Sequence, residues 1–173
     1  MVNRIVTGLV GIAGIMSAFW VADAEAADFK RPDCSAYRSS PLPEAKCFRE
    51  AKIAVRDANY EALQKTGLEF AYLARPPAGK ELNAYPEARK AAESKTEGEF
   101  LINFSVNTDG SVYDVKVIEA SSEPIGHLAK LWADTIAQWR FVKPAKPVTN
   151  VPFRRIYLYS KEDEGKRNQK NGG

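Results

Sequence analysis

Apolar and polar side chains alternate along one stretch near the middle of the chain, residues 99–107. Apolar residues occupy positions 100, 102, 104 and 106, and of the positions between them only Leu101 is apolar. A period of two is typical of a strand with one buried face. Asp109-Gly110 follows as a hairpin turn, with glycine at the position expected to need positive φ. The return strand is predicted to carry Tyr113, Val115 and Val117 on one face.

A stripe of apolar residues three or four positions apart predicts an amphipathic helix directly after the hairpin. Its start is marked by Ser-Ser-Glu-Pro at residues 121–124, a cap and first turn. The stripe consists of Ile125, Leu128, Trp132, Ile136 and Trp139. Such a stripe is suited to covering one face of a sheet. Pro144 and Pro147 then end the helical region, and the Tyr- and Ile-rich residues 151–160 predict a third strand.

Two further helices are predicted before the hairpin. The shorter one, residues 87–95, follows Tyr85-Pro86, with proline at a first-turn position. The longer one spans residues 44–65, where neither proline nor glycine occurs, and its stripe is Phe48, Ala51, Val55, Ala58 and Ala62. Because most of these side chains are small, we expect the longer helix to pack against another part of the protein. The order helix, β-hairpin, helix, strand predicts a small two-layer α+β domain preceded by a helical segment.

The first 26 residues are predicted to be a signal peptide. Arg4 is followed by an uncharged, largely apolar run over residues 5–21 and by two Ala-x-Ala sites that end at Ala24 and Ala26. A positive start, an apolar middle and small residues at the end are typical of a secretory signal, and we expect cleavage after Ala26. The alternative is an uncleaved anchor helix, since the run is at the short limit for spanning a bilayer.

Composition and charge narrow the class of protein. The chain has 173 residues, enough for one ordinary domain plus an accessory segment. With 25 basic and 22 acidic side chains the net charge is only +3, which does not predict a nucleic-acid partner. The expected division is a helical segment over residues 27–75, a linker over 76–80 with paired prolines, a domain over 81–160 and a disordered tail over 161–173.

Cys34 and Cys47 are the only two cysteines of the chain. Export through a signal peptide places them in an oxidising compartment, where a disulfide is favoured over two free thiols or a metal pair. A single histidine in the whole chain also makes a metal site a poor interpretation. We therefore predict a disulfide between Cys34 and Cys47.

Catalytic chemistry finds little support in the sequence. His127 is near the start of a predicted helix, with no nucleophile or orienting group that a pattern would place beside it. The acidic pairs and runs, Glu97 with Glu99 and residues 162–164, lack apolar surroundings that would raise a carboxyl pKa. The sequence contains no glycine-rich phosphate loop, His-x-x-x-His pair or Cys-x-x-Cys. We expect no enzymatic activity, no metal site and no cofactor.

The residues at the joints of this order of elements resemble those of one known family. They are Tyr85-Pro86 before a helix, Gly98 before the first strand, Asp109-Gly110 in the hairpin, and Trp139-Arg140-Phe141 with Pro144-Ala145 after the second helix. Together they are similar to the C-terminal domain of TonB and its relatives over about residues 81–160. These residues define a fold and carry no chemistry.

The resemblance implies a periplasmic binding or adaptor module that engages a protein partner of the cell envelope, such as an outer-membrane receptor or transporter. The implied mode is strand addition at the exposed edge of the third strand. The candidate contact residues are Val151, Phe153, Arg155, Tyr157 and Tyr159. We expect the preceding helix to cover the opposite face, which carries Ile156. A proline at position 157 is expected to abolish strand addition if the N–H of that residue faces the partner.

Two alternatives remain open from the sequence. One is an inner-membrane-anchored energy transducer of the TonB family that serves outer-membrane receptor-dependent transport. Against it stand the predicted cleavage site, the absence of a histidine in the apolar run and the absence of a long proline-rich spacer. The other is a small structural or inhibitory envelope protein whose N-terminal helix blocks the same strand edge.

Overall fold

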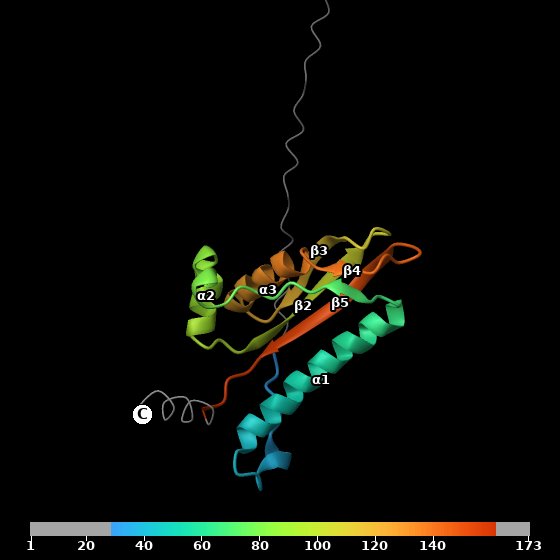
Figure 1. The fold of residues 1–173 in the computed structure, drawn as a ribbon. Coiled ribbons are helices and arrows are strands. Elements are labelled where there is room, and N and C mark those ends of the chain that lie inside the picture. Colours follow the sequence, from blue (N-terminus) through green and yellow to red (C-terminus); the bar gives the residue numbers. More distant parts are fainter. Residues whose placement is uncertain (1–28, 162–173) are drawn as a thin grey trace, which may run out of the picture.

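The computed structural model describes residues 29–161, in which helices and strands follow one another as in Figure 1. The N-terminal segment contains a short 3-10 helix η1 (Ser35–Tyr37), the long helix α1 (Pro43–Thr66) and strand β1 (Phe70–Tyr72). A second 3-10 helix η2 (Gly79–Ala84) leads into helix α2 (Pro86–Glu93). Strands β2 (Gly98–Val106) and β3 (Val112–Ala120), helix α3 (Glu123–Ile136) and strands β4 (Arg140–Phe141) and β5 (Val148–Tyr157) complete the order.

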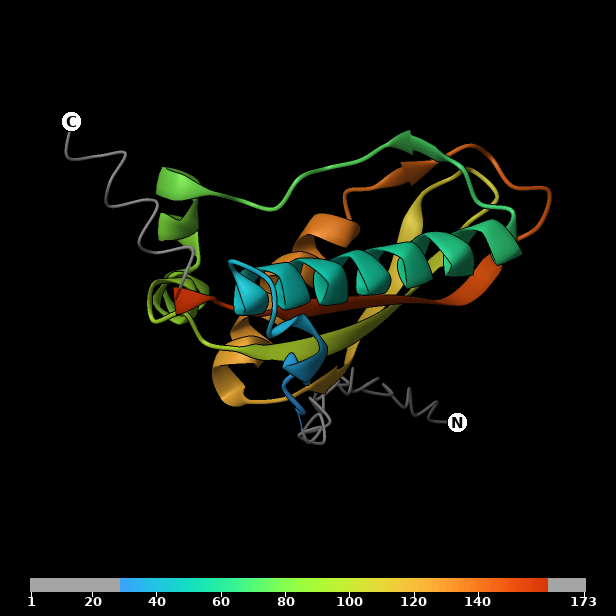
Figure 2. The same ribbon diagram turned by 90° about the horizontal axis from the view of Figure 1, so that it is seen from below.

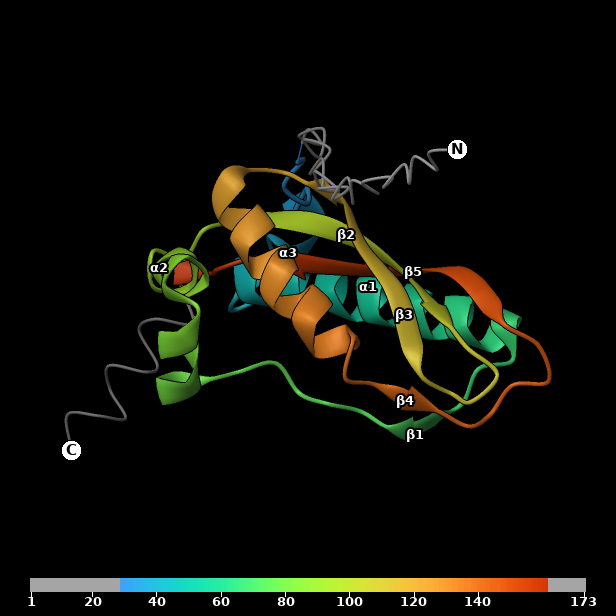
Figure 3. The ribbon, with the colours of Figure 1, turned by 90° about the horizontal axis from the view of Figure 1, so that it is seen from above.

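The central sheet has three antiparallel strands in the order β3-β2-β5. Phe100 of β2 lies opposite Ala120 of β3 on one side and opposite Arg155 of β5 on the other. The predicted alternation along β2 is confirmed, because Phe100, Ile102 and Phe104 are each at most 1% exposed. Figure 3 shows α3 crossing this buried face of the sheet.

The prediction for the return strand is wrong at one residue, Tyr113. Between Ser105 and Asn103, β2 advances two residues while β3 advances three, from Tyr113 to Lys116. The additional residue is accommodated with Asp114 at a φ of 50°. A bulge of this kind shifts the side-chain alternation by one position. Val112, Val115 and Val117 therefore pack against the core, whereas Tyr113 is exposed.

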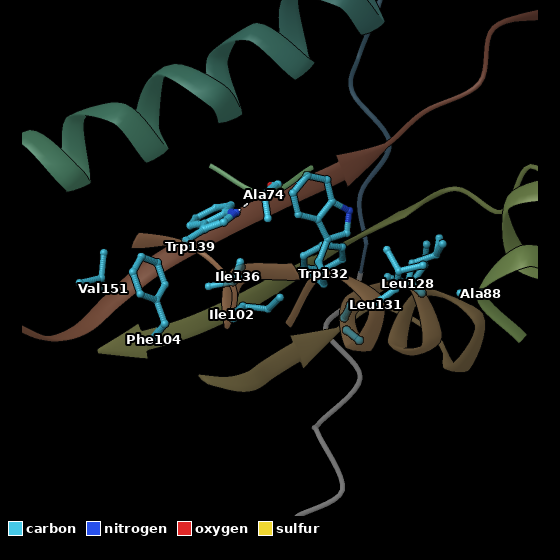
Figure 4. Packing of buried hydrophobic residues seen from close by; sticks show 14 of the residues in the cluster. Ala74, Ala88, Ile102, Phe104, Leu128, Leu131, Trp132, Ile136, Trp139 and Val151 are labelled. Atoms are coloured by element: carbon cyan, nitrogen blue, oxygen red, sulfur yellow. Dashed lines mark hydrogen bonds between the residues drawn. The ribbon is translucent and has the colours of Figure 1, made fainter. Parts of the chain in front are cut away.

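Helix α3 supplies the other half of the core, as its stripe predicts. All five stripe residues, Ile125, Leu128, Trp132, Ile136 and Trp139, are buried. The helix ends at Ile136, so Trp139 lies after a turn and directly before β4. Figure 4 shows Trp132 and Trp139 pointing from this region towards the side on which α1 runs, with Ala74 close by. The predicted two-layer α+β arrangement is thereby confirmed.

A small second sheet was not predicted from the sequence. It consists of β1 and β4, which pair antiparallel through Phe70 and Phe141. Phe70 stacks on Phe141 with ring centroids 4.7 Å apart and meets the edge of Trp139 at 5.4 Å. The strands have three and two residues, too few for a period to be recognised. This sheet holds residues 70–76 against the end of α3.

Helix α1 runs alongside β5 in both Figure 1 and Figure 2. The predicted helix is confirmed, and the expectation that it packs against another part of the protein is also met. Its predicted stripe is wrong at one position. Ala58 is exposed, and Asn59 is the half-buried residue that faces β5. The stripe consists of alanine at positions 58 and 62, and such small side chains do not clearly mark which face of the helix is buried.

The start of α1 is tied to the rest of the fold by a disulfide and by ion pairs. Cys34 and Cys47 are bonded, with Cα atoms 5.5 Å apart, which confirms the predicted pairing. Arg31 contacts Glu44 at 2.8 Å and Glu97 at 3.0 Å. Because Glu97 immediately precedes β2, these contacts join the N-terminal segment to the central sheet.

Loss of the disulfide is expected to lower the free energy of unfolding by about 3 kcal/mol, the loop-closure value for a link of this length. Urea unfolding of the Cys34→Ala/Cys47→Ala variant and of the oxidised protein measures the difference. Reductant should bring the unaltered protein close to the variant and leave the variant itself unchanged. An equal response of both proteins to reductant would contradict the prediction.

Several predicted boundaries differ from the observed ones. The third strand begins at Val148 and ends at Tyr157, so that residues 158–160 follow it instead of belonging to it. The predicted signal peptide, residues 1–26, and all but Lys161 of the predicted tail lie outside the described residues. None of the helices between residues 29 and 161 combines the length and the apolar character that a bilayer span requires.

Candidate protein-binding edge

The outer edge of β5 is the side of the sheet at which the resemblance implies that a partner binds. On its other side β5 pairs with β2, and within the described residues no strand pairs with its outer side. The backbone N–H and C=O of Arg154 both bond to the side chain of Asn59, at 2.9 and 2.8 Å. In an antiparallel ladder the backbone N–H and C=O of one residue point to the same side of the strand, and those of the next residue point to the opposite side. Arg154 therefore faces outward, and so do Pro152 and Ile156.

Helix α1 occupies much of this edge. Asn59 supplies one donor and one acceptor to Arg154, as a neighbouring strand would do. Two helical turns earlier along α1, Lys52 Nζ donates to the carbonyl of Leu158 at 2.7 Å. Leu158 is buried together with Phe48, and Ile156 packs beside them. The helix thus satisfies, through side chains and without adding a strand, the outward groups of Arg154 in β5 and the carbonyl of Leu158 just beyond it.

Pro152 marks the same edge from the strand itself. It has no N–H to offer, and its φ is restricted, so in sheets proline is confined largely to edge strands. Its outward position fits this rule, because an inward proline would remove a hydrogen bond to β2. On its outer side, β5 therefore lacks an N–H at Pro152, and α1 covers the strand at Arg154.

The prediction that the helix before the third strand covers the face with Ile156 is wrong. Helix α3 lies on the face that carries Phe153, Arg155 and Tyr157, whereas Ile156 faces α1. Phe153 packs on Trp132 with ring centroids 5.3 Å apart. The guanidinium of Arg155 lies 4.9 Å from the centroid of the Trp132 ring. The faces could not be assigned from the sequence, because two helices flank β5 and the pattern does not indicate which helix covers which face.

Tyr157 and Tyr159 occupy different environments. The hydroxyl of Tyr157 accepts a hydrogen bond from Nε1 of Trp132 at 2.8 Å, and burial raises the pKa of Tyr157. Tyr159 lies beyond the strand, where its backbone N–H donates to Glu97 at 2.9 Å. Burial, followed by the nearby charge of Glu97, raises the pKa of Tyr159. Val151 is fully buried. Of the five candidate contact residues, Arg155 alone is exposed.

Proline at position 157 was expected to abolish strand addition if the N–H of Tyr157 faces the partner, and this N–H does not face outward. Tyr157 lies opposite Gly98, two residues along from the inward-facing Arg155, so its N–H faces β2. Proline at position 157 would break the ladder to β2 whatever a partner does. The outward N–H groups that a partner strand would use belong to Arg154, where Asn59 now accepts the hydrogen bond, and to Ile156.

The residues that carry the family resemblance lie at joints of the fold, as expected for structural positions. Pro86 is at the start of α2, with Tyr85 half-buried before it. Side-chain and backbone hydrogen bonds from Ser111 hold the pKa of Asp109 below its ordinary value and close the turn at Gly110. Trp139 and Phe141 are buried, Gly98 is buried at the start of β2, and Pro144 lies between β4 and β5.

Other polar groups singled out in the sequence have structural partners. His127 Nε2 lies 3.9 Å from Glu123 one helical turn away. Glu97 is bound by Arg31, and Glu99 contacts Arg154 at 3.2 Å. Within residues 29–161, histidine, cysteine and acidic side chains form no group of three that could hold a metal ion.

Sequence reasoning missed Asn59, which bonds to the backbone of β5, and Lys52, which bonds to the Leu158 carbonyl just beyond it. A polar residue within an otherwise apolar helical stripe was the available signal, since Asn59 follows Val55 by four positions. The stripe was instead continued through Ala58.

Comparison with known proteins concerns the segment that contains α2 to β5. Residues 82–157 match the family model described as the C-terminal of the Gram-negative bacterial TonB protein. A stretch of 66 residues is 39% identical to protein TonB of two Helicobacter pylori strains and covers 38% of this chain. The chain spans only 22% and 23% of the length of these two curated relatives.

Solved structures of TonB C-terminal domains are similar to this chain, among them the following two. The solution structure of the Helicobacter pylori TonB C-terminal domain is 28% identical, with a TM-score of 0.32, and the match covers 50% of this chain and 99% of that one. The corresponding Pseudomonas aeruginosa domain is 17% identical, with a TM-score of 0.36, over 54% of this chain and 88% of that one.

Proposed function

Residues 82–157 belong to the TonB C-terminal domain family, and from this premise we propose that the chain is a non-enzymatic protein-binding module of the cell envelope. Its partner is an envelope protein, such as an outer-membrane receptor or transporter, captured as an extended segment along the outer edge of β5. The observation that carries this proposal is the hydrogen bonding of Arg154. Both of its outward backbone groups are satisfied by one side chain, Asn59, where a strand would otherwise pair.

The proposed binding mode places the partner in competition with α1. A strand at this edge needs the N–H and C=O groups of Arg154 and Ile156. Asn59 must then withdraw from β5, and Lys52 from the Leu158 carbonyl just beyond it. Two side-chain contacts are easier to exchange than a full strand ladder, because each net hydrogen bond contributes only about 1 kcal/mol. In this proposal the N-terminal helix covers the edge until a partner arrives.

Replacing Asn59 with alanine is expected to expose the Arg154 amide to solvent. We predict that its hydrogen exchange, followed by NMR, becomes about ten-fold faster, which corresponds to the loss of roughly 1.4 kcal/mol of protection. Gln64→Ala is the matched control, since Gln64 is an exposed amide in the last turns of the same helix. Equal exchange rates in the Asn59→Ala variant and in the unaltered protein would contradict the assigned contact.

Site-specific photocrosslinking tests the binding edge in cells that produce the protein. A photoreactive phenylalanine analogue at Pro152 should crosslink to an envelope protein, and more strongly in the Asn59→Ala background. The same analogue at Lys116, on the opposite edge strand β3, is the control position. Ile156→Pro should abolish the crosslink, and Ile156→Ala, which keeps the N–H, should retain part of it. A crosslink that forms at Lys116 instead would overturn the choice of edge.

A second candidate function is that of a small structural or inhibitory envelope protein, in which α1 never leaves β5. The burial of Phe48 and Leu158 against each other favours it. It differs from the first candidate in one expected result. If α1 covers the edge permanently, the Pro152 crosslink should be absent in the unaltered protein and should appear only when Asn59 is replaced.

We further propose that the chain is periplasmic, with residues 1–26 removed on export. The alternative is a transducer of the TonB family that keeps this segment as an inner-membrane anchor. N-terminal sequencing of the protein from fractionated cells distinguishes the two. A first residue at or near Ala27 in the soluble periplasmic fraction supports export, and an intact Met1 in the inner-membrane fraction supports the anchor.

A further inference from the structure

A groove of about 510 Å³ lies between α1, β5 and residues 70–76. Its volume falls within the range of roughly 300–1,000 Å³ that is typical of small-molecule sites. Its floor is aromatic and consists of Trp132, Trp139 and Phe153, which pack on one another with centroids 5.3 and 5.5 Å apart. The Nε1 group of Trp139 donates to the carbonyl of Ala74 at 2.9 Å and so holds one wall in place.

The walls of the groove expose apolar side chains to solvent. Ile53 and Tyr60 of α1 are 38% and 53% exposed, and Leu73 on the facing wall is 54% exposed. Large apolar residues at this exposure on both walls of one groove, above an aromatic floor, form a continuous apolar surface. Such surfaces on soluble domains mark ligand or partner sites.

Every charged side chain that lines the groove is cationic. These residues are Arg49, Lys52, Arg56, Arg75, Arg154 and Arg155. Three of them have carboxylate partners outside the groove lining: Arg56 with Asp57, Arg75 with Glu81 and Arg154 with Glu99. Arg49 and Arg155 take part in none of the ion pairs formed among residues 29–161. An apolar groove with uncompensated positive charge at its rim is complementary to an anionic ligand with a hydrocarbon body.

We propose that this groove binds a free, single-chain anionic amphiphile, a carboxylate head with a hydrocarbon tail such as a fatty acid. The tail lies over Trp132 and Trp139, and the head pairs with Arg155 and Arg49. An extended peptide fits less well, because its backbone would bring a donor and an acceptor at each residue. The groove offers few acceptors for them as long as Asn59 stays bonded to the outward groups of Arg154, that is, before a partner displaces it from β5. A fatty acid confines its polar atoms to one end.

Titration of the full chain with dodecanoate below its micelle concentration tests the site. The indole N–H signals of Trp132 and Trp139 in a two-dimensional NMR spectrum report on the floor directly. We expect saturable shifts of both signals. Dodecanol, with the same chain and no charge, should bind at least ten-fold more weakly, and dodecyltrimethylammonium should not shift the two signals.

Single substitutions at the rim test the charge. Arg155→Gln and Arg49→Gln should each weaken dodecanoate binding about ten-fold, the effect of one charge-assisted hydrogen bond. Arg38→Gln is the matched control, because Arg38 is exposed and does not line this groove. All three residues are exposed, so the unfolding midpoint in urea should stay unchanged for Arg49→Gln and Arg38→Gln. It should fall only slightly for Arg155→Gln, which loses the contact with the Trp132 ring, and binding should be separable from folding.

Several outcomes would overturn the proposal. Equal affinity for dodecanol and dodecanoate would leave the cations without a role. Shifts that appear with phosphatidylglycerol vesicles and not with dodecanoate would assign the charges to a membrane surface. An acidic, leucine-containing peptide that shifts the two indole signals when dodecanoate does not would assign the groove to a protein segment. Because Asn59, Arg154 and Ile156 line the groove and also belong to the proposed contact at the edge of β5, the peptide outcome bears on both proposals. Crosslinking at Pro152, which does not line the groove, tests partner capture separately.

Discussion

Replacing Gly110 with alanine is expected to lower the free energy of unfolding by roughly 3–5 kcal/mol, the combined effect of backbone strain and steric overlap. Gly110 has a φ of +85°, which side chains other than hydrogen rarely allow. A Cβ atom at this position would lie 2.1 Å from the carbonyl oxygen of Phe141. This oxygen belongs to the backbone, so no side-chain rotation relieves the overlap.

The effect should spread beyond the hairpin because Gly110 contacts β4. Its carbonyl accepts the Phe141 N–H at 2.9 Å, and the Phe141 ring stacks on Phe70 and Phe104. Displacement of Phe141 would therefore disturb the small β1–β4 sheet and the core together. Urea unfolding gives the change in free energy, and exchange of the Phe141 amide reports its location.

Two other glycines separate the causes. Gly126, inside α3, would place a Cβ atom 3.9 Å from that of Ala120, so Gly126→Ala should stabilise the protein by up to about 1 kcal/mol through helix propensity. Gly67 has a φ of +71° but nothing within 4 Å, so Gly67→Ala should cost only about 1–2 kcal/mol from strain. If Gly110→Ala costs no more than Gly67→Ala, the close contact with Phe141 is not a determinant of stability.

Replacing Trp139 with alanine is expected to cost about 3–5 kcal/mol, the range for a buried aromatic side chain. Trp139 is 3% exposed and meets Phe70, Phe104 and Phe153 within 6 Å, centroid to centroid. It connects the β1–β4 sheet, the core and the floor of the groove. Its loss should therefore lower the urea midpoint and loosen residues 70–76 together.

Trp139→Phe isolates the hydrogen bond to Ala74. The phenyl ring keeps much of the packing but leaves the buried Ala74 carbonyl without its donor, which costs about 1–3 kcal/mol. Val142→Ala, at a neighbouring position that is 51% exposed, is the control and should change stability by no more than about 0.5 kcal/mol. Equal stability of the Trp139→Phe variant and the unaltered protein would remove the hydrogen bond from this account.

The elements that the sequence predicted well are those whose patterns are long and whose buried residues are large. The alternation of Phe100, Ile102 and Phe104 identifies β2, and the stripe from Ile125 to Ile136 identifies α3. Each pattern repeats several times within one element, so a local property suffices to define the element and its buried face. The turn at Gly110 is equally local, because only glycine readily adopts its backbone conformation. The pairing of Cys34 with Cys47 follows from there being two cysteines.

The candidate edge shows where this reasoning reached its limit. The sequence predicted the third strand and an open edge on it, and it predicted that the long N-terminal helix packs against another part of the protein without indicating which part. Periodicity describes which side of an element is apolar, and it does not say which other element covers that side. With a helix available on each face of β5, assignment of Ile156 to α3 was as consistent with the pattern as assignment to α1.

By itself the sequence determined the helices, the central hairpin, the disulfide pairing and the resemblance to TonB C-terminal domains, because each depends on residues close together in the chain or on motifs at fixed spacing. Only the tertiary structure decided that α1 lies along β5, that Asn59 bonds to Arg154 95 residues further on, and that cationic side chains from α1, β5 and Arg75 line one groove. These features depend on how distant segments meet. A bulge at Asp114, two strands too short to show a period and one asparagine among small apolar residues leave no repeating pattern from which they could be predicted.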